Sequence, residues 1–294
     1  MTVRRLAQLS ALALAALTLW GLIVGSEVGP SDPFALEIYA SFAVIVVIVF
    51  ATGFYALRFA TAGSEMYWRM NGKNQVRPVL WLILAILTFM FAVGWLLEEP
   101  GRLEPFYAAE ASYLLAGTLV PAGFLYFRWV AWPVRSRRPA TLSLVLISIV
   151  GIGFASAWSY VAYVIPPDRL PLLPVGPMLA TLGALIVGAT AEEIVFRVLL
   201  LTAMLSAGES RFQAVFLSSM AFALMHVPGQ LYQPVMTADW ALMRDVAGDY
   251  ATGFVAQFAI GLFLGVLWLR TGSITLIAAT HAMINTGKVL ALGL

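Results

Sequence analysis

The feature that most constrains this chain is a succession of apolar runs, each close to the length that a helix needs to cross a bilayer. A spanning helix needs about 20 mostly apolar residues. Nine such runs, bounded by charged residues, proline or glycine, cover residues 6–25, 38–57, 79–97, 111–130, 142–165, 177–204, 212–227, 251–269 and 274–290. The sequence therefore predicts an all-α fold, a polytopic transmembrane helix bundle of about nine spans whose solvent is the lipid bilayer.

Composition supports this class and excludes others. Of 294 residues, 61% are hydrophobic and 11% are charged, whereas soluble domains are about half apolar and about a quarter charged. The chain contains no cysteine, which excludes disulfides, thiolate metal ligands and cysteine nucleophiles. The net charge is only +2 and the basic residues are scattered over short loops, so nucleic acid is not expected as a partner.

The placement of charge predicts the orientation in the membrane, because Lys and Arg are biased toward cytoplasmic loops. If the N-terminus is cytoplasmic, most Lys and Arg fall on the cytoplasmic side and most Asp and Glu fall on the opposite side. This pattern favours an odd number of spans in an integral multi-pass protein of the cell membrane. The first run could also be read as a signal peptide, whose removal would leave eight spans. We favour an anchor, since no small-x-small cleavage site directly follows it.

The positions of ionisable side chains divide the chain into two predicted regions. Residues 1–173 form an N-terminal region of five spans, with no acidic or histidine side chain deep within a span. Residues 174–294 form the last four spans, which contain several acidic and histidine side chains deep within the apolar runs. A charge at mid-span costs about 2.5–3.5 kcal/mol, so such side chains usually have partners and a function. The catalytic core is therefore expected in the last four spans.

Three charged residues lie inside one long apolar run. Glu193 and Arg197 are four residues apart and share a face of an α-helix, so they can form an ion pair that offsets both burials. Glu192 points about 100° away from Glu193 and is left for another role.

Both histidines of the chain lie in predicted spans. His226 follows Phe222 by four residues and directly precedes Val227 and a Pro-Gly pair, which is expected to end the helix. His281 precedes Asn285 by four residues, so these two side chains project from one helical face.

Together these residues fit hydrolysis. A carboxylate in a low-dielectric site is a competent general base, so Glu192 can take a proton from water. His226 can position that water or carry the proton to the leaving amine. His281 and Asn285 can donate hydrogen bonds to the oxyanion that develops on the substrate. No serine nucleophile is needed.

The motifs resemble those of a known family, the CAAX prenyl proteases and bacteriocin-processing enzymes, also called the CPBP or Abi family of intramembrane endopeptidases. The family pattern is Glu-Glu-x-x-x-Arg, Phe-x-x-x-His and His-x-x-x-Asn on successive helices. In this order the chain has Glu192-Glu193-x-x-x-Arg197, Phe222-x-x-x-His226 and His281-x-x-x-Asn285.

The resemblance implies a role for each matched residue and covers about Pro174 to Asn285. Glu192 and the first histidine would activate water, His281 and Asn285 would form the oxyanion hole, and Glu193 with Arg197 would brace the site. It also implies a helical bundle with a water-filled cavity. The expected partner is a membrane-associated peptide or protein, with or without a lipid group, because family members range from prenylated-protein processing to peptide maturation and immunity functions.

The sequence leaves three alternatives to a metal-free protease open. No cofactor is required, but Glu192, His226 and His281 form a two-His, one-carboxylate set that catalytic zinc accepts. A transporter also uses buried carboxylates, although those would be spread through a repeated architecture. A non-catalytic membrane scaffold or immunity protein on a proteolytic fold is the third alternative.

The segment between residues 230 and 250 is long for a connection between two spans. Trp240, Met243 and Val246 recur at three-residue spacing among polar residues, which indicates a short interfacial helix.

Overall fold

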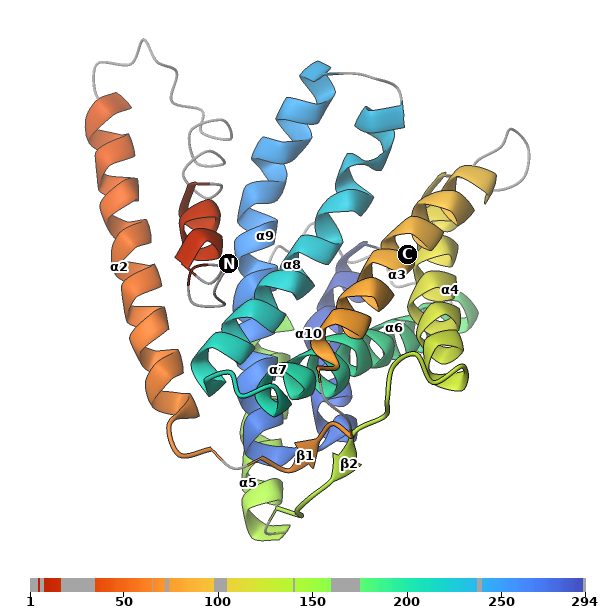
Figure 1. Cartoon of the computed structure of the whole chain (residues 1–294). Coiled ribbons are helices and arrows are strands. Elements are labelled where there is room, and N and C mark those ends of the chain that lie inside the picture. The colour runs from red at the N-terminus through yellow and green to blue at the C-terminus, as the bar shows by residue number, and fades with distance from the viewer. Residues whose placement is uncertain are drawn as a thin grey trace. The chain divides into compact units, whose positions relative to one another are not determined.

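Figure 1 shows the computed structural model of the protein. It describes residues 5, 8–16, 35–64, 66–71, 74–97, 105–139, 141–159, 175–236 and 240–292. The described residues are helical apart from one short two-stranded antiparallel sheet and the connecting segments, so the all-helical expectation is confirmed. The ends of two expected runs, residues 17–25 and 160–165, lie outside the described residues.

The helices follow the apolar runs closely. In chain order the structure has α2 (Ala35–Thr61), α3 (Val76–Leu97), α4 (Pro105–Tyr126), α5 (Thr141–Ser159) and α6 (Val175–Glu193). A π-helix, η3 (Ile194–Leu201), directly continues α6 and is followed by α7 (Thr202–Ser206), α8 (Arg211–Met236), α9 (Trp240–Thr271) and α10 (Ile274–Leu292). The strands are β1 (Trp68–Arg69) and β2 (Val134–Arg135).

Among the described residues, three helices are long and apolar enough to cross a membrane: Val76–Leu97, Arg211–Gly229 and Gly253–Thr271. Shorter apolar helices cover Ala111–Tyr126, Leu144–Ala157 and Ile274–Thr286.

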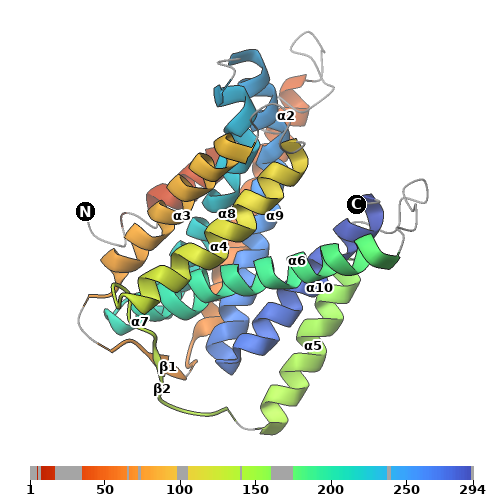
Figure 2. The same ribbon diagram turned by 90° about the vertical axis from the view of Figure 1, so that its right-hand side faces the viewer.

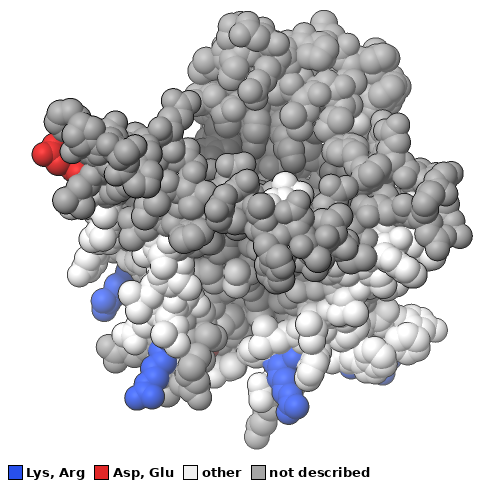
Figure 3. Space-filling view, turned by 90° about the horizontal axis from the view of Figure 1, so that it is seen from above, with Lys and Arg blue, Asp and Glu red and all other residues white. Residues whose placement is uncertain are grey.

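Large apolar side chains on α3, including Leu80, Trp81 and Trp95, are exposed. On the face viewed in Figure 3, the described surface is mostly uncharged, and Lys and Arg side chains project at its edge. Outward apolar surfaces of this kind suit contact with lipid.

Two expectations for the segment after His226 are wrong. The Pro-Gly pair does not end the helix, because α8 continues through Pro228 and Gly229 to Met236. Pro228 lacks only the N–H that would bond the carbonyl of Leu224, and long apolar helices tolerate this loss. Residues 240–250 do not form a separate interfacial helix but are the first part of the 32-residue α9. No proline interrupts α9.

The chain forms two compact units, and each consists of two segments that are separate in the sequence. Unit 1 comprises Met1–Ser64 and Gly208–Val266, and unit 2 comprises Glu65–Ala207 and Leu267–Leu294. In unit 1, α2 contacts α8. The ring of Phe54 on α2 lies 4.9 Å from that of Phe216 on α8 and 5.4 Å from that of Phe212. Phe216 in turn meets Phe258 of α9 edge-on, at 5.2 Å.

Two glycines let α8 and α9 approach closely within unit 1. A Cβ atom at Gly261 would lie 2.9 Å from Cβ and 3.1 Å from Cα of Ser219. A Cβ atom at Gly265 would lie 2.9 Å from Cγ1 of Val215. The glycines are four residues apart and therefore share one face of α9. Such small-residue contacts are typical of helices packed in membranes.

In unit 2, α3 packs against α4, α4 against α6, and α10 against both α6 and α5 (Figure 2). The β1–β2 sheet pairs Trp68 with Arg135, and the guanidinium of Arg135 lies 5.7 Å from the centre of the Trp68 ring. The Trp68 indole stacks on Trp268 and donates a hydrogen bond to the carbonyl of Gly272 at 2.7 Å. These contacts hold the end of α9 to the sheet.

The close approach of α8 and α9 predicts a specific sensitivity. Gly261→Ala should lower the stability of the protein in detergent by about 1–3 kcal/mol, because the new methyl group meets the backbone of Ser219. Gly53→Ala is the matched control, since a Cβ atom there meets nothing within 4 Å. It should be neutral or stabilising by up to about 1 kcal/mol. Thermal unfolding measures both, and a Gly261→Ala protein that melts at the wild-type temperature would contradict the packing.

Candidate active site

The site is built around the point where α6 changes into a π-helix. Glu192 and Glu193 are the last two residues of α6, and Arg197 lies in η3. A π-helix is rare and often occurs at functional sites, because it rearranges side chains that an α-helix would place in regular register. The side chains of Glu193 and Arg197 are fully buried.

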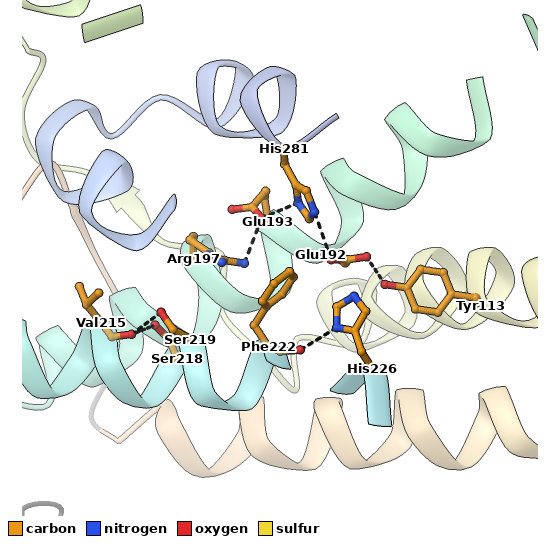
Figure 4. A network of polar contacts seen from close by, with 10 residues as sticks. All are labelled: Tyr113, Glu192, Glu193, Arg197, Val215, Ser218, Ser219, Phe222, His226 and His281. Atoms are coloured by element: carbon orange, nitrogen blue, oxygen red, sulfur yellow. Dashed lines mark hydrogen bonds and ion pairs between the residues drawn. The ribbon is translucent and has the colours of Figure 1, made fainter. Parts of the chain in front are cut away.

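Glu193 is the central acceptor of a buried polar network (Figure 4). The expected ion pair is present: Nη1 of Arg197 donates to Oε1 of Glu193 at 3.0 Å. The same oxygen lies 2.8 Å from Nδ1 of His281, which projects from α10 and is also buried. One carboxylate oxygen therefore joins the π-helix to α10.

The contact with Glu193 fixes the proton on the His281 ring. An ionised carboxylate can only accept hydrogen bonds, so Nδ1 must carry the hydrogen of this contact. The other ring nitrogen, Nε2, lies 3.8 Å from Oε2 of Glu192. Glu193 thus orients His281 and turns its second nitrogen toward the neighbouring carboxylate.

Glu192 occupies a different environment from Glu193. Its side chain is 12% exposed, and its Oε1 accepts a hydrogen bond from the hydroxyl of Tyr113 on α4. The separation of 3.8 Å between Glu192 Oε2 and His281 Nε2 is too long for a direct hydrogen bond. An oxygen atom about 2.8 Å from each of them would satisfy both, so the pair can hold a water molecule or a reacting oxygen.

The π-helix is braced from α9 within the same unit. The hydroxyl of Thr202 donates to the carbonyl of Arg197 at 3.2 Å, five residues earlier. The indole of Trp268 donates to that hydroxyl at 3.3 Å. Both side chains are buried. This chain of bonds supports the backbone that carries Arg197.

Asn285 follows His281 by one turn on α10, and it is half-buried. Residues four apart lie on the same helical face, so the Asn285 amide is on the face of α10 that carries His281.

His226 and Phe222 lie in unit 1, one turn apart on α8. His226 is half-buried, and its Nδ1 lies 2.9 Å from the carbonyl oxygen of Phe222. Because a carbonyl only accepts, Nδ1 carries the hydrogen, and in a neutral ring Nε2 is then the atom that can take up a proton. Phe222 is buried and its ring meets the imidazole edge-on at 4.9 Å.

Sequence reasoning missed two features of the site. Tyr113 belongs to the N-terminal region and has no motif around it, although a polar Ser-Tyr pair inside an apolar run was a weak signal. The π-helix leaves no signature in the pattern of apolar residues, because residues 195–201 are all buried.

The zinc alternative has only part of its ligand set within one unit. Zinc binds nitrogen and carboxylate oxygen at about 2.0–2.2 Å, so two donors 3.8 Å apart can share one ion. Glu192 and His281 fit this requirement, and His226 lies in unit 1. Within the described ranges, no group of three or more His, Asp or Glu side chains is arranged to hold a metal ion.

A known protein family matches the segment of the chain that carries the three motifs. Residues 174–287 match the family model of the type II CAAX prenyl endopeptidases, Rce1-like. All three motifs fall within this segment, and the match confirms the family resemblance. A comparison with curated proteins finds no match, and neither does one with solved structures.

The buried Glu193–Arg197 pair predicts a large effect of removing one partner. Arg197→Leu should lower the stability in detergent by about 3–5 kcal/mol, because it leaves a buried carboxylate without its cation. Glu193→Leu combined with Arg197→Leu should recover part of that loss. Arg77→Leu, at an exposed arginine of α3, is the control and should change stability by less than about 0.5 kcal/mol. Thermal unfolding measures these changes. An Arg197→Leu protein that melts at the same temperature as the Arg77→Leu control would contradict the buried ion pair.

Proposed function

We propose that the protein is an intramembrane endopeptidase that hydrolyses a peptide bond of a membrane-associated protein or peptide. The observation that carries this proposal is the convergence of Glu192 Oε2 and His281 Nε2 at 3.8 Å, with Glu193 holding the far side of the same imidazole. Two carboxylates in different environments can take different roles, one as base and one as orienting group. The family match supports a peptidase at the level of the family.

In this proposal Glu192 acts on water. Its Oε2 takes a proton from a water molecule held between the carboxylate and His281, and the water oxygen attacks the carbonyl carbon of the scissile peptide bond. The negative charge passes to the carbonyl oxygen. His281 and Asn285 donate hydrogen bonds to this oxygen from one face of α10.

Donation by His281 places a condition on its protonation. Since Nδ1–H is directed at Glu193, a hydrogen bond from Nε2 to the oxyanion requires the ring to carry a second proton. The Glu193 carboxylate, itself paired with Arg197, lies directly against the ring and can balance its charge. Glu193 and Arg197 therefore support the site without touching the substrate.

His226 completes the proton transfers in the proposal. The carbonyl of Phe222 accepts from Nδ1, so the proton leaves and enters at Nε2. In the proposal Nε2 receives the proton that Glu192 took from the water and gives it to the nitrogen of the leaving amine as the tetrahedral intermediate collapses, so that Glu192 returns to its carboxylate form. The same nitrogen positions the attacking water before the bond breaks.

The membrane arrangement is part of the proposal. About nine spans, a cytoplasmic N-terminus and a location in the cell membrane follow from the apolar runs and the charge asymmetry. Residues 1–173 would form a five-span region that supports a catalytic core in residues 174–294. The substrate would reach the site from the bilayer or its surface, with or without a lipid group.

The assignment predicts that activity depends on single site residues. Farnesylated and unmodified CAAX peptides of identical sequence, incubated with the protein in detergent, allow cleavage to be followed by mass spectrometry. Glu192→Gln, His226→Ala and His281→Ala should each lower turnover by about 10²–10⁴-fold, because each removes a proton-transfer or charge-stabilising group. Glu209→Gln makes the same chemical change outside the site and should retain activity.

Two outcomes would contradict the assignment. Full turnover in all three site variants would show that cleavage comes from other residues. No cleavage of any peptide by the wild-type protein would exclude this substrate class and favour a scaffold or transport role.

A chelator separates the two hydrolytic mechanisms. We propose a metal-free reaction, so the wild-type protein should keep its turnover after dialysis against 1,10-phenanthroline. Turnover that is lost on this treatment and restored by zinc would instead assign Glu192, His226 and His281 as metal ligands.

A further inference from the structure

We propose that Tyr113 is a positioning residue of this site, which holds the Glu192 carboxylate in the orientation that hydrolysis requires; the inference rests on the proposed function. Tyr113 lies on α4, outside the segment 174–287 that matches the family model. Its hydroxyl donates to Oε1 of Glu192 (Figure 4). The N-terminal region of the chain thus contributes a side chain to the site.

The packing of α4 on α6 brings the phenol to this place. A Cβ atom at Gly188 would lie 3.6 Å from Cδ2 of Leu114 and 3.9 Å from Cε1 of Tyr113. One turn further along α4, a Cβ atom at Gly117 would lie 3.7 Å from Cβ of Ala191. The small residues keep the two helices close, so the Tyr113 ring lies beside Gly188. Glu192 follows Gly188 by one turn and meets the hydroxyl.

The two oxygens of Glu192 consequently have separate partners. Oε1 accepts from Tyr113, and Oε2 faces Nε2 of His281 at 3.8 Å. A glutamate side chain has three rotatable bonds, and a hydrogen bond to one oxygen restricts all of them. Tyr113 therefore leaves the other oxygen facing Nε2 of His281, the two atoms between which the proposed reaction places a water molecule. Catalytic geometry is sensitive to this, since a displacement of about 1 Å can cost about 10²-fold in rate.

Tyr113→Phe tests the role, because it removes the hydroxyl and keeps the ring beside Gly188. On the CAAX peptide that the wild type cleaves best, kcat should fall about 10–100-fold while KM and the melting temperature stay unchanged. Tyr126→Phe is the matched control, since Tyr126 lies on the same helix and is 81% exposed. It should leave kcat at the wild-type value.

A double variant distinguishes positioning from general structural support. If Tyr113 acts through Glu192, Tyr113→Phe should cause no further loss of kcat in a Glu192→Gln background. An equal loss in both backgrounds, or a loss that follows a lowered melting temperature, would overturn the positioning role. Full kcat in the single variant would overturn it as well.

An infrared measurement keeps the inference testable without turnover. The carboxylate band of Glu192, identified by its disappearance in Glu192→Gln, should shift in Tyr113→Phe and stay in place in Tyr126→Phe. An unshifted band would show that the hydrogen bond does not exist. A shifted band in a protein that cleaves no peptide would instead show that the bond is present and that the proposed function is wrong.

Discussion

The arrangement of the site depends on one buried carboxylate, Glu193. Its Oε1 accepts from Arg197 in the π-helix and from His281 on α10, and all three side chains are buried. An unpaired charge in this position would be very unfavourable, so each partner constrains the other two. The shared oxygen is the reason why His281 presents Nε2 toward Glu192. The orientation of His281 toward Glu192 therefore depends on the Glu193–Arg197 pair.

The neighbouring helices α4 and α10 bring further side chains to the two glutamates. Glu192 and Glu193 are adjacent at the end of α6 and point to different sides of the helix, where Glu192 meets Tyr113 of α4 and Glu193 meets His281 of α10. Glycine and alanine residues between α4 and α6 allow the Tyr113 hydroxyl to reach Glu192. The N-terminal region, which the family match does not cover, thereby contributes one hydrogen bond to the candidate site.

Much of this structure could be predicted from the sequence, because a bilayer requires long apolar segments whose backbone hydrogen bonds are satisfied within a helix. The apolar runs predicted the helices, and the four-residue spacing of Glu193 and Arg197 predicted their ion pair. The helix through Pro228 was not predicted, since a proline stops short soluble helices far more effectively than long apolar ones. Tyr113 and the π-helix were missed because they depend on packing between distant segments, which no local pattern records.

In the proposed reaction, water activated by Glu192 attacks the peptide bond directly. Mass spectrometry of a cleavage reaction that contains hydroxylamine tests it, because an acyl-enzyme intermediate would react with this nucleophile, whereas direct attack by water forms none. We predict that the new C-terminus is a free carboxylic acid and that the intact mass of the protein does not change during turnover. A hydroxamate product, or a protein that carries the acyl group of the substrate, would exclude direct attack by water.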